Sequence, residues 1–594
     1  MFQIGIGKSD ITTFQEGAGM LGYGIYYNIM KEIETRLYAR TFIFKNGDTK
    51  LAYVNCELGF ITPSLKRGVL KKLQRKHAEL GYTDENLLMA AQHTHSGPSG
   101  FSHHGLYNTS TPGFSIKIYS NLVEKITESI VLAEKNFQNA DIYLGKGEFE
   151  PEKEVGFQRS IKAYLQNPEA KKITKEELHL GINREMKLLK IKAKTGDDIA
   201  SINWFGTHTT NMPNTNHKVS SDNKGYAATY FEEEKGNDFV AIFAQGICGD
   251  VTPRFTYNKK YTKQRGNWDG KYEDAIKSAQ YNGNLQYEKA TEIHHNADQE
   301  ISTINQLDSA IRYSDFGNIQ VNPKYTGGKE NIRTSPSCMG VAFLEGTYYD
   351  GPGMLEPLAS LAKGMSLFIK GFEYAKSLFM PKEWGLAMRQ KYAAQGKKRI
   401  AMETGARKIY GTHNINGLII PGFTDEVIYN LKKFHRRGAW DKNPWTPQIL
   451  PLQIVQIGSI VLAAFPFEIT TIAGERLQKS IEEILLDKNG IEEVILSPYS
   501  NAYNGYITTY EEYQVQEYEG GHTVFGEWTL AALQTEFEKL CIEMLKPKNE
   551  RNVNHDALPP TFTEEDLKRF EYYKGKYYLR TIRKKNRKAK REKV

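Results

Sequence analysis

Two histidines separated by one residue are the first feature of this sequence that could do chemistry. His93 and His95 follow the apolar run at residues 87–91, and the chain then breaks at Gly97-Pro98. In an extended chain, residues i and i+2 point to the same side, so we expect both imidazoles to face one pocket at a strand end. One could bind a metal while the other handles a proton. The tripeptide alone is a weak signal, because paired surface histidines are common.

Two further residues stand at predicted junctions between elements. His208 precedes a turn-rich run in SINWFGTHTTNMP, and Glu468 lies between a strand and a helix in FPFEITTIAGERL. Catalytic zinc typically takes three protein ligands, and two histidines with one carboxylate is a known set. Each residue also has a structural interpretation, His208 as a core histidine and Glu468 as a first-turn carboxylate favoured by the helix dipole. The residues alone leave both interpretations open.

The elements that must position these residues alternate between strands and helices. Runs of β-branched or large apolar residues predict strands at residues 37–44, 51–55, 87–91, 186–191, 240–244, 454–465 and 494–496. Apolar residues recur at helical spacing at residues 64–80, 116–136 and 472–486. This mixture predicts an α+β fold, with mixed and antiparallel sheets covered by helices. No internal repeat or Pro/Ser-rich linker divides residues 1–527, so we expect one large catalytic domain there.

The composition of other segments predicts their character. Residues 257–300 are polar and rich in Lys, Asn and Tyr, which favours a surface excursion, and residues 355–410 favour a helical insertion. An amphipathic pattern after Trp528 predicts a C-terminal helix and loop over residues 528–570. Residues 571–594 carry eleven Lys/Arg against two Glu, and we expect a basic, disordered tail.

Charge and composition limit the partners. The net charge is +8 and the tail alone carries +9, so the rest of the chain is near neutral. The tail could act as a solubilising segment or contact anionic lipid headgroups at a membrane surface. No nucleic-acid-binding motif is visible, and no run approaches the ~20 apolar residues that span a bilayer. The start MFQIGIGKSDITTF lacks a signal-peptide pattern, and four distant cysteines without a CxxC pair argue against a thiolate zinc site.

Long motifs in a constant order connect most of the chain to one family. The sequence resembles the neutral/alkaline non-lysosomal ceramidases, which hydrolyse the amide of N-acylsphingosine. The matching motifs include GIGKSDIT (5–12), MLGYG (20–24), AAQHTHSGPSG (90–100), GLYNTSTPGF (105–114), RSIKAYLQNP (159–168), SSDNKGYA (220–227), FAQGICGDVTP (243–253), EGTYYDGPG (345–353), PWTPQILPLQIVQIG (444–458), FEITTIAGERL (467–477) and YITTYEEYQVQEYEG (506–520).

The resemblance implies a Zn²⁺ cofactor, a lipid substrate and eight site residues. The implied zinc ligands are His93, His208, Glu468 and Tyr506, and the residues implied around the scissile amide are His95, Arg159, Tyr518 and Thr252. In this assignment His95 is the general base and then the acid. Arg159 and Tyr518 would stabilise the developing oxyanion, at about 3 kcal/mol per donor. The products would be a fatty acid and a sphingoid base. The resemblance also favours a secreted, periplasmic or membrane-peripheral protein, and a cytoplasmic one stays open.

Three departures from the family pattern put the substrate in doubt. Thr252 stands in GDVTP where the family usually has Ser, and Phe467 replaces a Gly beside the proposed ligand. The immunoglobulin-like domain that many members carry at the C-terminal end is not evident after Trp528. A zinc hydrolase of another N-acyl amide or of an ester therefore stays open, as does a lipid-binding protein without turnover.

Overall fold

The computed structural model describes residues 1–236, 238–257, 268–351, 353–418, 425–553 and 557–591. Within these residues, a nine-stranded sheet has the order β11-β9-β8-β6-β1-β3-β4-β5, with β15 paired to β6. Its strands are β1 (Gln3–Asp10), β3 (Tyr38–Asn46), β4 (Thr49–Cys56), β5 (Leu87–Ala91), β6 (Phe137–Glu148), β8 (Glu185–Ala193), β9 (Asp198–Phe205), β11 (Val240–Gln245) and β15 (Gln299–Glu300). The inner pairs are antiparallel, whereas β4 with β5 and β9 with β11 are parallel.

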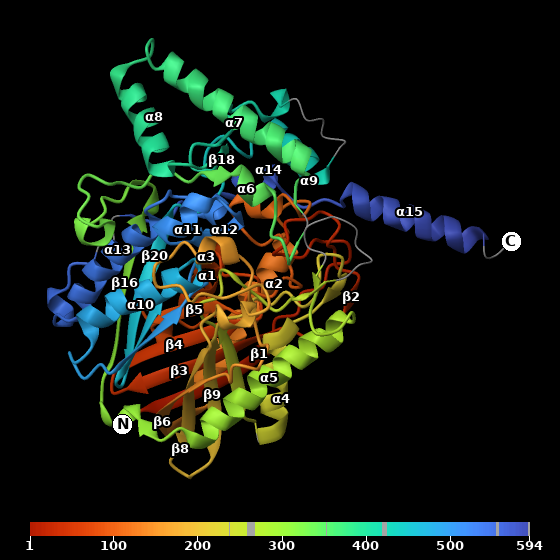
Figure 1. Ribbon diagram of the computed structural model, residues 1–594. Helices are drawn as coiled ribbons and strands as arrows, with labels where there is room; N and C mark the ends of the chain where they lie inside the picture. The colour runs from red at the N-terminus through yellow and green to blue at the C-terminus, as the bar shows by residue number, and fades with distance from the viewer. Residues whose placement is uncertain (237, 258–267, 352, 419–424, 554–556, 592–594) are drawn as a thin grey trace.

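A second sheet packs face to face against the first. It contains β16 (Leu307–Asp315), β20 (Ile449–Ile457), β21 (Ile460–Ala464) and β23 (Glu493–Ser497). Side chains from both sheets, such as Phe42, Leu189, Val455 and Ile495, form one buried cluster between them. The α+β prediction is confirmed, and the two sheets form the inner layers of a layered sandwich (Figure 1).

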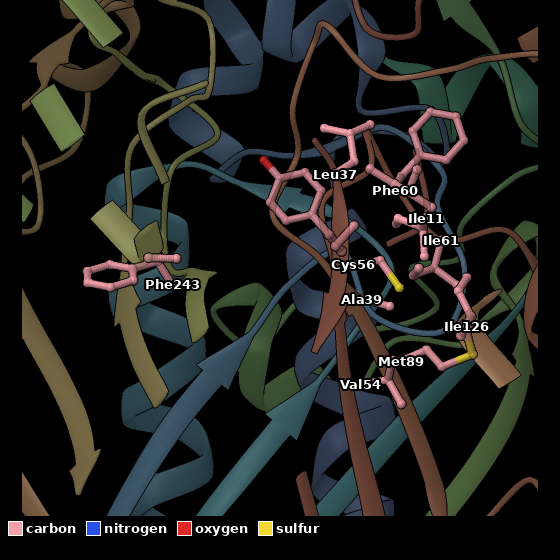
Figure 2. Close-up of a cluster of buried hydrophobic side chains, with 14 of the residues drawn as sticks. Ile11, Leu37, Ala39, Val54, Cys56, Phe60, Ile61, Met89, Ile126 and Phe243 are labelled. Carbon is pink, nitrogen blue, oxygen red and sulfur yellow. The ribbon is translucent and has the colours of Figure 1, made fainter. Parts of the chain in front are cut away.

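Helices cover the outer face of each sheet. The first sheet is covered by α1 (Pro63–Lys76), α2 (Ile116–Glu134), α4 (Asp222–Lys235) and α5 (Ala275–Asn296), and the second by α10 (Thr471–Leu485) and α13 (Thr529–Met544). The period of two in β3 explains how one strand serves both cores: Phe42 and Phe44 face the second sheet, while Ala39 and Ile43 face the helices. Figure 2 shows this helix-side core, in which Ala39, Val54 and Met89 lie near Ile126 of α2.

Two segments differ from the sequence-based expectation. In the expected polar excursion at 257–300, residues 258–267 lie outside the described residues, and α5 packs on α4 with Leu285 and Ile293 buried. The amino-acid composition did not indicate a packed helix here, because several buried positions of α5 are polar, among them Asn282 and Gln286. In the expected disordered tail, α15 spans Lys576–Arg591 and projects from the body (Figure 1). Tyr578 near its start is buried. Residues 592–594 lie outside the described residues.

Among the described helices, none has both the length and the apolar character needed to cross a bilayer.

Candidate metal centre and active site

The loops that follow β5 and β9 meet directly. Thr94 and Thr209 form a parallel bridge, and the backbone N–H of His95 donates to the carbonyl of Thr209 at 3.3 Å. The two strands belong to opposite ends of the first sheet, but β11, the neighbour of β9, also approaches β5, so the sheet curls. The curl brings His93 and His95 beside His208.

The two histidines of the first motif converge, although not through an extended backbone. His93 has a φ of 76°, in the left-handed region that β-carbon-bearing residues rarely adopt. Its ring nevertheless meets that of His95, with their Nε2 atoms 3.0 Å apart. Such strain is characteristic of functional positions held by the surrounding structure. The i, i+2 spacing therefore predicts correctly that the two rings meet. The assumption of an extended backbone at His93 is wrong.

Backbone carbonyls fix the tautomers of two histidines. Nδ1 of His93 lies 2.6 Å from the carbonyl of Gly59, and Nδ1 of His208 lies 2.9 Å from that of Val251. A carbonyl can only accept, so each Nδ1 carries a proton, and Nε2 is the nitrogen through which the neutral ring could bind a metal. Burial, followed by the positive charge of Arg159, lowers the pKa of His208 and keeps its ring neutral.

Glu468, from the other half of the chain, lies beside both Nε2 atoms. Its Oε2 lies 3.1 Å from Nε2 of His208 and 3.4 Å from Nε2 of His93. Burial acts to raise the pKa of Glu468, but the two histidines outweigh it and hold that pKa well below its usual range. Two imidazole nitrogens that converge on one carboxylate oxygen form a donor set that a metal ion can bind once the proton between them is released.

The described residues fit a metal ion in a second way. The ring nitrogens of His93, His95 and His208 lie within 4.8 Å of one another, a spacing at which they could hold a metal. His95 differs from the other two because no described residue hydrogen-bonds its buried Nδ1. Burial, followed by His93 and His208, lowers the pKa of His95 well below its usual value. The tautomer of His95 is thus not fixed by a hydrogen bond at Nδ1, as the tautomers of His93 and His208 are.

Tyr506 lies next to Glu468 through a short parallel pair of strands, β22 (Glu468–Ile469) and β24 (Tyr506–Ile507). Its hydroxyl lies 3.0 Å from Nη2 of Arg159. Burial, followed by the Glu468 carboxylate, raises the pKa of Tyr506 well above its usual value. A cation or a metal beside the oxygen is what would favour the phenolate.

Arg159 is fully buried and held by two carboxylates. Nη1 pairs with Asp350 at 2.9 Å and Nε with Glu519 at 2.9 Å. Thr252 donates to the other oxygen of Asp350 at 2.5 Å, so Asp350 connects Thr252 to Arg159. The guanidinium also lies 5.7 Å from the ring of Tyr518, whose pKa is raised by burial, so that the phenol keeps its proton as a donor.

The structure thus brings all eight predicted residues into one region, where seven are buried and Tyr518 is half-buried, and it adds residues that the sequence reasoning missed. Asp350 and Glu519 position Arg159, and the hydroxyls of Tyr499 and Tyr503 donate to Glu468. Asp350 and Glu519 stand inside motifs quoted above, EGTYYDGPG and YITTYEEYQVQEYEG. The acidic residues in these two motifs were the signal that the sequence offered. Their partner, Arg159, is far away in the sequence, so the pairing could not be predicted.

Comparison with known proteins agrees with this geometry. The family model described as neutral/alkaline non-lysosomal ceramidase, N-terminal, matches residues 2–416 and 434–535. The neutral ceramidase of Pseudomonas aeruginosa is 32% identical over 547 residues, covering 91% of this chain and 72% of the relative. Neutral ceramidase A of Dictyostelium discoideum is 32% identical over 600 residues, covering 95% and 77%.

Solved structures show the same fold. The crystal structure of the neutral ceramidase from Pseudomonas aeruginosa superposes with a TM-score of 0.73 at 29% identity, covering 94% of this chain and 76% of that one. A structure described as ceramidase complexed with C2 gives a TM-score of 0.75 at 30% identity, covering 94% and 77%. With most of the chain matched in both sequence and fold, this protein belongs to the neutral/alkaline non-lysosomal ceramidase family.

Proposed function

We propose that this chain is a zinc-dependent hydrolase that cleaves the amide bond of ceramide or a closely related N-acyl lipid, giving a fatty acid and a sphingoid base. The observation that carries the proposal is the convergence of two carbonyl-fixed imidazoles on the Glu468 carboxylate. The relatives named neutral ceramidases supply the substrate class.

In this proposal His93, His208, Glu468 and Tyr506 hold the metal. Bound zinc supplies a Lewis acid for the amide carbonyl and an activated water at neutral pH. Nε2 of His95 faces the same space, and its unanchored Nδ1 leaves the ring free to take a proton and return it to the leaving amine. Arg159, locked on its two carboxylates, has little freedom to reorganise as charge develops on the carbonyl oxygen. Tyr518 adds a protonated phenol on the same side.

Of the two substitutions that put the substrate in doubt, one is removed from the site. The ring of Phe467 packs in the core, 5.2 Å from Phe316 and 6.4 Å from Phe525. Thr252 keeps a hydroxyl, which is bound to Asp350. Its added methyl is the specific feature that favours the second candidate, a zinc hydrolase of another N-acyl amide or of an ester.

The basic C-terminal helix supports a peripheral contact with a membrane. Arg583, Lys584 and Lys585 of α15 are exposed, and each basic residue near an anionic surface contributes about 1 kcal/mol. Deleting residues 583–594 should lower turnover of vesicle-borne substrate without changing turnover of detergent-dispersed substrate. Equal turnover of vesicle-borne substrate by the two forms contradicts this contact and leaves the helix as a solubilising segment.

The test of the proposed function combines metal analysis with a substrate panel. The purified protein should contain zinc and release fatty acid from ceramides, and His93→Ala combined with Glu468→Ala should abolish both. Zinc that persists in the double variant contradicts the ligand set. Turnover of another N-acyl amide or of an ester without turnover of ceramide assigns the second candidate. No turnover by a zinc-loaded protein favours a lipid-binding protein.

A further inference from the structure

A helical hairpin that projects from the body is built with its apolar side outward. It consists of α7 (Glu356–Lys376) and α8 (Lys382–Gln395), which stand away from both sheets in Figure 1. The large apolar side chains of α7 and of the following turn are exposed, at 65% for Leu361, 70% for Phe368, 58% for Phe372, 78% for Leu378 and 88% for Phe379. An ordinary surface helix buries such residues.

The side of α7 that faces the protein is small or polar instead. Its buried residues are Ala359, Ala362, Ser366 and Glu373. Glu373 pairs with Lys391 of α8 at 2.7 Å and accepts the hydroxyl of Tyr392 at 2.9 Å, so polar contacts join the two helices. α7 is therefore held in place by charge and small-residue packing, while α8 packs Met388 and Tyr392 into a buried apolar cluster of the body. The apolar face of the hairpin is left without a partner among the described residues, and contiguous exposed apolar patches of this kind mark interaction sites.

The charges around this face select the partner. Residues 355–399 carry nine Lys/Arg against three Glu, and Lys376, Lys382 and Arg389 are exposed close to the turn. A second copy of the chain would bring two positive hairpins together, which is unfavourable. A bilayer with anionic lipids satisfies both features, because it accepts apolar side chains at the headgroup boundary and attracts the basic residues around them. We propose that the α7–α8 hairpin docks this protein on an anionic lipid bilayer by inserting the apolar turn around Leu378 and Phe379.

The base of the hairpin leads directly to the active site. Asp350, which holds Arg159 and Thr252, lies six residues before Glu356, the first residue of α7. Phe343 in α6 (Val341–Leu344), at the same base, lies 5.3 Å from the ring of Tyr518. Docking through the hairpin would thus place the catalytic region close to the bilayer in which a lipid substrate lies. This second step rests on the proposed function, whereas the docking itself does not.

Vesicle binding without substrate tests the docking. The chain should co-sediment more strongly with vesicles of phosphatidylcholine plus phosphatidylserine than with phosphatidylcholine alone. Leu378→Glu combined with Phe379→Glu should weaken binding to the anionic vesicles by about tenfold or more, because two large side chains no longer leave water on docking. Both positions are exposed, so folding and zinc content should not change. Ile116→Glu, at a 60% exposed position on α2, is the matched control and should bind as the wild type does.

Three results would overturn the inference. These are equal vesicle binding by the double variant and the wild type, an equal loss in Ile116→Glu, and a wild-type dimer in light scattering that the double variant dissociates. Turnover of a detergent-dispersed short-chain substrate is measured in parallel and should be the same in all three proteins. Vesicle binding without any turnover would contradict the proposed function but not the docking. Turnover of the detergent-dispersed substrate without vesicle binding would contradict the docking but not the proposed function.

Discussion

His93 and His95 are two residues apart, yet their hydrogen-bonding environments differ, and this difference supports the separate roles proposed for them. The carbonyl of Gly59 fixes the tautomer of His93, while Nδ1 of His95 has no partner among the described residues. A metal ligand benefits from a fixed tautomer and orientation, whereas a proton carrier must exchange its proton during each turnover. The distinction therefore lies in the hydrogen bonds behind the rings rather than in the residue type.

Substitution of each histidine should separate these roles. His93→Ala should lose zinc and turnover together, because a ligand is removed. His95→Ala should keep zinc and lower kcat by about 10²- to 10⁴-fold, the usual contribution of a general base. Metal analysis and steady-state kinetics on the two variants measure this. Equal zinc loss in both would show that the histidine triad, with His95 as a ligand, is the metal site.

A different buried histidine should make the protein sensitive to acid. Burial, followed by His103 and Arg67, lowers the pKa of His104 to about 3, and neither ring nitrogen has a hydrogen-bond partner among the described residues. Below the unfolded pKa of about 6.5, the unfolded chain binds a proton that the folded state excludes, so stability falls as the pH drops from 6.5 towards 3. His104→Phe should reduce the stability lost between pH 7 and pH 4.5 by about 2 kcal/mol.

Denaturant unfolding at the two pH values checks this expectation, with the exposed His413→Gln as the control. An unchanged difference between pH 7 and pH 4.5 in His104→Phe would show that His104 is protonated in the folded protein.

At the scale of elements, the loop of the MLGYG motif packs against the imidazole of His95. Met20 bridges to Pro98, which places the loop beside the turn after His95. Gly22 has a φ of 119°, and a β-carbon there would lie 2.3 Å from Cγ of His95. Only glycine allows this approach.

Gly22→Ala should therefore displace His95 and leave the metal ligands in place. We expect kcat to fall by about 100-fold, the typical effect of a displacement of about 1 Å, with zinc content unchanged. Gly24→Ala is the matched control, because Gly24 has a φ of 66° but no atom within 4 Å of the place that a β-carbon would occupy. It should lose about 1 kcal/mol of stability and little rate. An equal loss of rate in both variants would attribute the effect to backbone strain alone.

At the scale of the whole molecule, the site lies where two halves of the chain join. The loops after β5 and β9 of the first sheet bring His93, His95 and His208, while the segments that follow β21 and β23 of the second sheet bring Glu468 and Tyr506. Asn501 connects the halves: its backbone N–H donates to the carbonyl of Met89 at 2.7 Å, and its Oδ1 accepts the N–H of Met89 at 3.1 Å. Met89 lies in β5, four residues before His93.

Asn501→Ala should loosen this connection and with it the metal site. The variant leaves a buried N–H without its acceptor and places alanine at a φ of 64°, so we expect a loss of about 2 kcal/mol in the free energy of unfolding. Zinc affinity should fall by about tenfold, as for residues that orient metal ligands. Asn489→Ala, at an exposed position with a φ of 51°, controls for the backbone cost. Unchanged zinc affinity in Asn501→Ala would show that the halves are aligned without this residue.

The sequence by itself determined what depends on local periodicity and on long motifs. The alternation of strands and helices predicts the α+β class. The i, i+2 spacing predicts that His93 and His95 meet, as they do, although His93 is not in an extended conformation. The motifs contain all eight residues that we propose for the site. Composition was less informative where buried positions are polar, as in α5, because hydrophobic periodicity is then weak.

Only the tertiary structure decided how these residues act on one another. The carbonyls behind His93 and His208, the pairing of Arg159 with Asp350 and Glu519, and the position of Gly22 against His95 all join segments far apart in the chain. The outward orientation of the apolar face of α7 was also decided only by the tertiary structure. A helical pattern predicts that the helix has an apolar face, but not whether that face packs on the protein or points away from it. Local propensity contains no information on such contacts, because they arise when the curled sheet and the second half of the chain pack together.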